Sequence, residues 1–135
     1  MFTVEVIYQD QNRETVDFES KPSLDVKGNF VCLECGSGQK LVFNIDTVLY
    51  ARVSYPPQNT VKPFKFTSEA HYHTKNETVE LLMHSTAPKI EVKVGGNGGV
   101  LLLKEDDNVL RIINGDWLEG IKVDFFNDQL AGKKK

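Results

Sequence analysis

The feature that most constrains the fold is the alternation of apolar and polar residues between Glu77 and Phe126. A period of two places every second side chain on the same face of a pleated strand. Three runs follow this period: Val79-Leu81-Met83, Ile90-Val92-Val94 and Ile121-Val123-Phe125. Turn-forming sequences rich in Gly, Asn, Asp and Pro separate the runs. We therefore predict strands at 77–84, 89–94, 99–105, 108–114 and 117–126.

The remainder of the chain has the same character, with short runs of β-branched and aromatic residues between turns. The expected strands are 2–9, 14–19, 30–34, 40–44, 46–55, 64–66 and 70–74. A chain of 135 residues is long enough for one domain with its own core. About 10 to 12 short, mostly antiparallel strands are typical of an all-β single-domain sandwich or a small closed β-barrel. We expect little or no helix.

One segment interrupts this pattern, since residues 55–63 contain three prolines. Proline lacks the amide that a central strand needs, so we expect the segment to be a loop or a crossover, the alternative being a linker between two small domains. We expect a single domain over 1–135, with a two-half organisation of 1–55 and 64–128 joined by the Pro-rich crossover 56–63. Residues 129–135 end in three lysines and are expected to form a basic disordered tail.

Charge and hydropathy limit the classes of partner. The net charge is −3, from 16 basic and 19 acidic residues, which disfavours nucleic acid as the partner. No apolar run approaches the roughly 18 residues of a membrane span. The first residues do not resemble a secretory signal, because Glu5 and Asp10 interrupt any apolar stretch. These observations predict a cytoplasmic protein without membrane association.

Two cysteines offer the first candidate chemistry. Cys32 and Cys35 are separated by two residues, a spacing found in half of many zinc sites. His71 and His73 would supply two further ligands, because residues i and i+2 of a strand point the same way. We therefore consider a structural zinc ion held by these four side chains. The alternative is that Cys32 belongs to the core and Cys35 to a turn, with no cofactor.

His71, His73 and Glu77 also form the pattern His-x-His-x3-Glu. This pattern resembles the first half of the metal motif of the cupin family, a double-sheet β-barrel. The resemblance covers seven residues and implies a divalent transition metal bound by two imidazoles and one carboxylate. The chain departs from the family in having Lys65 where a glycine is expected, and in lacking the second motif.

Aromatic residues interspersed with lysines form the last candidate surface. Phe64 and Phe66 alternate with Lys65 and follow Lys62, a pattern suited to stacking on single-stranded RNA or another ligand. Tyr72 and Trp117 would extend this surface. The alternative is that these aromatic side chains are buried in the core.

No catalytic constellation emerges from the sequence, so we predict a non-enzymatic binding or assembly module that acts through its surface. Sheets of this kind have edges that must be covered or paired, so a protein partner or a homo-oligomer is expected. Such a chain would suit an accessory protein encoded by a phage or plasmid. The alternatives are an RNA-binding small β-barrel and a zinc-stabilised or cupin-like metal-binding protein.

Overall fold

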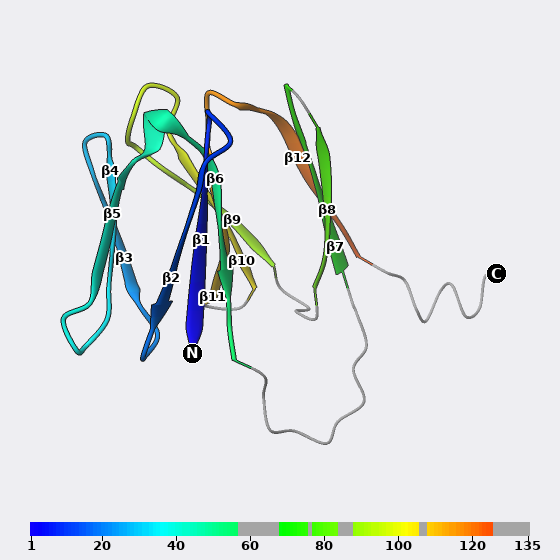
Figure 1. Ribbon diagram of the computed structural model, residues 1–135. Helices are drawn as coiled ribbons and strands as arrows, with labels where there is room; N and C mark the ends of the chain where they lie inside the picture. The colour runs from blue at the N-terminus through cyan, green and yellow to red at the C-terminus, as the bar shows by residue number, and fades with distance from the viewer. Residues whose placement is uncertain (57–67, 76, 84–87, 106–107, 126–135) are drawn as a thin grey trace, which may run out of the picture.

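The computed structural model describes residues 1–56, 68–75, 77–83, 88–105 and 108–125. These residues form twelve strands in three antiparallel sheets and one three-residue 3-10 helix (Figure 1). The predicted all-β class is therefore confirmed. In the described part of the chain the sheets are open, so the arrangement is sandwich-like and the closed barrel is not found. None of the described residues forms a helix with the length and apolar character needed to cross a bilayer.

A six-stranded central sheet combines both halves of the chain. Its order is β2-β1-β6-β11-β10-β9. The strands span, in that order, Arg13–Phe18, Phe2–Tyr8, Val48–Ser54, Asn108–Asn114, Val100–Glu105 and Lys89–Lys93. The first half of the chain supplies β1, β2 and β6, and the second half supplies the other three. The halves join where β6 pairs with β11, with Ala51 opposite Ile112.

Two three-stranded sheets cover the faces of the central sheet, giving three layers (Figure 1). The first outer sheet has the order β3-β4-β5, spanning Ser23–Lys27, Phe30–Glu34 and Lys40–Asn44. The second outer sheet has the order β12-β7-β8, spanning Leu118–Phe125, Ser68–Thr74 and Thr78–Met83.

Side chains of the central strands point alternately toward the first and the second outer sheet, so they supply the core on both faces of the central sheet. On β11, Ile112 packs toward the first outer sheet and Ile113 toward the second, and both are fully buried. Consecutive side chains of a strand point to opposite faces, so a strand covered on both sides reads as a continuous apolar run. This explains the sequence Leu101-Leu102-Leu103 on β10.

Two details differ from the sequence-based expectation. Ser23–Lys27 forms strand β3, which is not among the expected strands because Pro22 and the neighbouring polar residues obscure its pattern. Its alternation is short, and only Leu24 and Val26 pack against the core. The expected strand 46–55 begins at Val48, because Ile45–Thr47 forms the 3-10 helix. The Asn44 side chain caps this helix by accepting a hydrogen bond from the Asp46 amide at 3.0 Å.

The glycine-rich turn between β9 and β10 is packed into the fold. Gly96 has a φ of +64°, and an added Cβ would lie 2.6 Å from the Ile45 side chain. The Asn97 amide donates to Asp46 Oδ1 at 2.8 Å. A backbone amide of the turn therefore binds the carboxylate of Asp46 and holds the turn against the 3-10 helix.

Candidate functional site

The cysteine and histidine pairs considered for zinc lie in different layers. Cys32 is on β4 and Cys35 directly follows it, in the first outer sheet, whereas His71 and His73 are on β7 in the second. The central sheet separates the two outer sheets. The structure therefore does not bring the four side chains together. No group of three or more His, Cys, Asp and Glu side chains suited to a metal ion occurs among the described residues.

The two cysteines also have different environments. Cys32 is half-buried on the outer face of its sheet, whereas Cys35 is buried. Cys35 Sγ lies 3.1 Å from Ser37 Oγ and 3.4 Å from Gln39 Oε1. The hydrogen bond from the Ser37 side chain is the main cause that lowers the pKa of Cys35 to about 7. Cys35 is thus held by local polar groups in the turn after β4.

The histidines of the cupin-like pattern lie on the outer face of the second outer sheet. His71 Nε2 is 3.1 Å from Glu69 Oε1, and its Nδ1 is 3.5 Å from Glu80 Oε2. His73 Nδ1 is 3.0 Å from Thr78 Oγ1. Glu77 is exposed in the turn after β7. The carboxylates nearest His71 are therefore two residues that the pattern did not include.

The aromatic surface proposed for RNA falls largely outside the described residues, which exclude Lys62, Phe64, Lys65 and Phe66. Its other two members are in the core. Tyr72 is completely buried and Trp117 is 6% exposed. The Tyr50 ring stacks on Trp117 with ring centroids 5.6 Å apart. Tyr72 and Trp117 therefore pack between the central sheet and the second outer sheet and present no free ring face.

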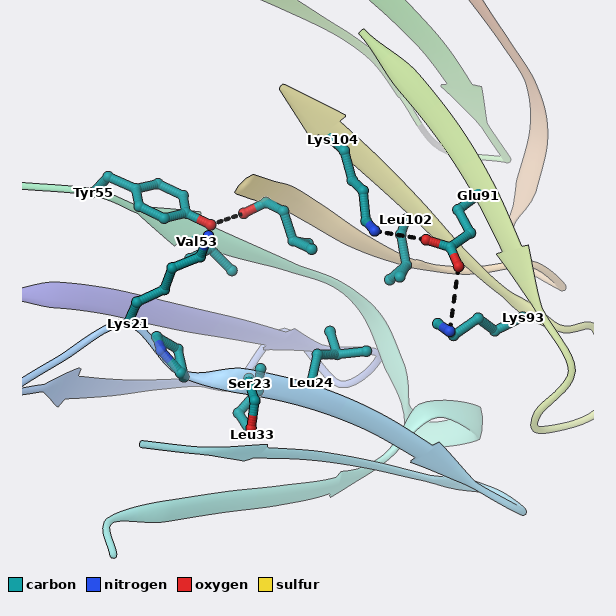
Figure 2. Close-up of a pocket in the computed structure, with 12 residues that line it drawn as sticks. Lys21, Ser23, Leu24, Leu33, Val53, Tyr55, Glu91, Lys93, Leu102 and Lys104 are labelled. Atoms are coloured by element: carbon teal, nitrogen blue, oxygen red, sulfur yellow. Dashed lines mark hydrogen bonds and ion pairs between the residues drawn. The ribbon is translucent and has the colours of Figure 1, made fainter. Parts of the chain in front are cut away.

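The structure reveals a different candidate, a cleft of about 250 Å³ between the central sheet and the first outer sheet (Figure 2). We call it the interlayer cleft. Its apolar floor comes from both sheets and comprises Leu24, Leu33, Val53, Leu102 and Val109. Its polar rim and remaining wall comprise Lys21, Pro22, Ser23, Tyr55, Glu91, Lys93 and Lys104.

Among the described residues, the edge strands β3 and β9 come together at one end through a contact between glycine backbones. At that end the Gly96 amide donates to the Gly28 carbonyl at 2.9 Å. Gly95 lies so close to β3 that an added Cβ would be 2.5 Å from Val26 Cγ1. Ser23 and Leu24, which line the cleft, lie at the opposite end of β3. The two sheets therefore diverge from the glycine contact, and the cleft occupies the wider end.

A chain of ion pairs borders this cleft (Figure 2). Lys104 Nζ lies 2.7 Å from Glu91 Oε1, and Lys93 Nζ lies 3.3 Å from Glu91 Oε2. These lysines, Lys104 first, lower the pKa of Glu91. Two ammonium groups share one carboxylate, which leaves a net positive charge on this wall.

Tyr55 closes the far side of the cleft. Its hydroxyl donates to the Val109 carbonyl at 2.9 Å, and its ring packs edge-on against Phe2. Burial raises the pKa of Tyr55 to about 12. The tyrosine is thus fixed in position and stays protonated near neutral pH.

The interlayer cleft was not predicted from the sequence, although two of its charged residues show a recognisable spacing. Glu91 and Lys93 are two residues apart and therefore share a face of one strand. Placing Lys104 beside them requires the register of the β9–β10 hairpin, in which Leu102 is opposite Glu91. The contribution of Leu24 and Leu33 depends on a sheet that is distant in sequence from the hairpin.

The chain matches no known protein family, no curated protein and no solved structure.

Proposed function

We propose that the protein is a non-enzymatic binding module whose interlayer cleft holds a small amphipathic anion. The observation that carries this proposal is the combination of an apolar floor with the paired ammonium groups of Lys93 and Lys104. Ligand sites are typically concave and mostly apolar, with a few polar groups that fix orientation. An alkyl chain would occupy the floor, and its carboxylate would contact the lysines.

The ionisation states of the cleft support binding rather than proton transfer. The lysines hold Glu91 in its charged form, so it is a weak base. Tyr55 has a raised pKa and donates its proton to a backbone carbonyl. Neither group is therefore prepared to exchange a proton with a bound molecule near pH 7.

Titration of isotope-labelled protein with hexanoate, followed by NMR, tests this proposal. Hexanoate is expected to shift the amide signals of Leu24, Leu102 and Val109, and hexan-1-ol is expected to bind more weakly because it lacks the charge. Lys104→Gln should reduce hexanoate affinity about tenfold, the effect of losing one charge-assisted hydrogen bond. The same variant should leave hexan-1-ol affinity unchanged.

Lys40→Gln is the matched control, since it removes the same charge from β5, where Lys40 lies 4.0 Å from Glu34 and does not line the cleft. It should leave hexanoate binding unaltered. Shifts that avoid the cleft residues, or equal losses of affinity in both variants, would contradict the proposal.

A further inference from the structure

Strand β9 is one edge of the central sheet and differs from the other edge. Among the described residues its only strand partner is β10. Its three apolar residues are unusually exposed, at 40% for Ile90, 72% for Val92 and 96% for Val94, which directly follows the strand. At the opposite edge, β2 presents mainly polar exposed residues. Natural sheets usually protect their edges with charged residues, and an apolar edge is a template for strand pairing.

The sequence of β9 is complementary to itself in one antiparallel register. With Val92 opposite Val92 of the partner subunit, Glu91 lies opposite Lys93 of the partner subunit, and Ile90 lies opposite Val94 of the partner subunit. Opposite charges and β-branched pairs at facing positions stabilise an antiparallel ladder. The two-fold symmetry repeats each favourable pair.

Neighbouring registers are less favourable. If Glu91 instead of Val92 lies on the two-fold axis, the two Glu91 carboxylates face each other. If Lys93 lies on the axis, the two Lys93 ammonium groups face each other. Directly facing like charges are destabilising. Centring on Ile90 would place Pro88, which cannot donate a backbone hydrogen bond, opposite Val92. The register centred on Val92 is therefore the one that satisfies both charge and side-chain pairing.

We propose that two copies of this chain associate through β9, joining their central sheets into one continuous antiparallel sheet. The exposed side chains of Ile90, Val92 and Val94 of the two copies then lie next to each other on the same face of the joined sheet. Glu91 and Lys93 also line the interlayer cleft, so Lys93 of the partner subunit lies beside the cleft wall. This interface goes beyond the proposed ligand binding and does not require it.

Analytical ultracentrifugation of the full chain tests the interface by mass, independently of any ligand. The wild-type protein should sediment at twice the chain mass of 15.2 kDa. Val92→Glu places two carboxylates opposite each other on the symmetry axis and should raise the dimer dissociation constant at least about tenfold. Val42→Glu is the control, because Val42 is 53% exposed on edge strand β5, and this variant should remain dimeric.

A charge exchange tests the register itself. Glu91→Lys and Lys93→Glu each create facing like charges in a homodimer, so each variant alone should be monomeric. Mixing the two variants restores facing opposite charges and should yield a heterodimer, and the double variant should again form a homodimer. A monomeric wild-type protein, a dimeric Val92→Glu variant or a mixture that stays monomeric would overturn the proposal.

Discussion

The two interfaces of the central sheet bury different kinds of side chain. Toward the first outer sheet, the described residues form one continuous cluster of fifteen buried side chains, mostly aliphatic. Toward the second, they form two smaller clusters of five and three, centred on aromatic rings and on Met83 and Leu103. A single sheet thus supports one extensive aliphatic core and one divided, more aromatic core.

Hydrogen bonding reinforces this difference. Tyr72 Oη, Trp117 Nε1 and Arg111 Nε are buried without a hydrogen-bond partner among the described residues, and Tyr72 and Trp117 belong to the second interface. A buried polar group without a partner costs about 1–3 kcal/mol. Among the described residues, the first interface therefore buries the larger apolar cluster, and the second contains the groups whose burial is least favourable.

The largest expected effect comes from truncating neighbouring isoleucines of β11, which face the two interfaces. Ile112→Ala should lower the free energy of unfolding by about 4 kcal/mol, and Ile113→Ala by about 3 kcal/mol, because a smaller cluster collapses more readily around a cavity. Urea denaturation of both variants measures the difference. An Ile113→Ala variant that is the less stable of the two would reverse the comparison.

The connection from β11 to the second outer sheet is tightly packed at Gly115. An added Cβ there would lie 2.1 Å from the Gly98 carbonyl oxygen, so the backbone must move. Gly115→Ala should therefore cost about 2–3 kcal/mol. Thermal unfolding should show a clear decrease in Tm, whereas Gly36→Ala, with no atom near the added Cβ, should change stability by less than about 0.5 kcal/mol.

Two tyrosines allow the hydrogen-bonding difference to be measured directly. Tyr55→Phe removes a hydrogen bond to the Val109 carbonyl and should cost about 1 kcal/mol. Tyr72→Phe removes a hydroxyl that interacts with the Arg111 side chain but forms no hydrogen bond of ordinary geometry among the described residues, so it should cost less than Tyr55→Phe. Equal destabilisation in both variants would show that the Tyr72 hydroxyl is satisfied in solution.

At pH 7 the smallest effect concerns Cys35, at the margin of the first interface. Its folded-state pKa of about 7 lies below the ordinary value of 9.0. The folded state is therefore favoured by thiolate formation, and this contribution grows as pH rises from about 7 to about 9 and is lost as pH falls through 7. Thiolate absorbance of Cys35 should titrate near pH 7 in the folded protein and near pH 9 in urea. Cys35→Ser should abolish the transition near pH 7 and halve the one in urea, because the unfolded chain still contains the Cys32 thiol.

Much of the fold could be predicted from the sequence because side-chain alternation is a local signal. The runs around Val79, Ile90 and Ile121 indicated strands that the structure contains. Local signals do not specify which sheets face each other, so Cys32 and His71 were considered together although the central sheet lies between them. The cleft could not be predicted for the same reason, since Leu33 and Lys104 meet only when two sheets pack.

The pairing of β6 with β11 has a consequence for synthesis of the chain. Strands β1 to β6 form their other pairings among themselves, but one side of β6 has no neighbour until β11 is translated. The ribosome adds the intervening 53 residues in roughly 3–10 s at usual elongation rates. During that time the backbone edge of β6 that later pairs with β11 stays unpaired on the nascent chain. The emerging first half should therefore be a substrate for chaperones that bind apolar strands.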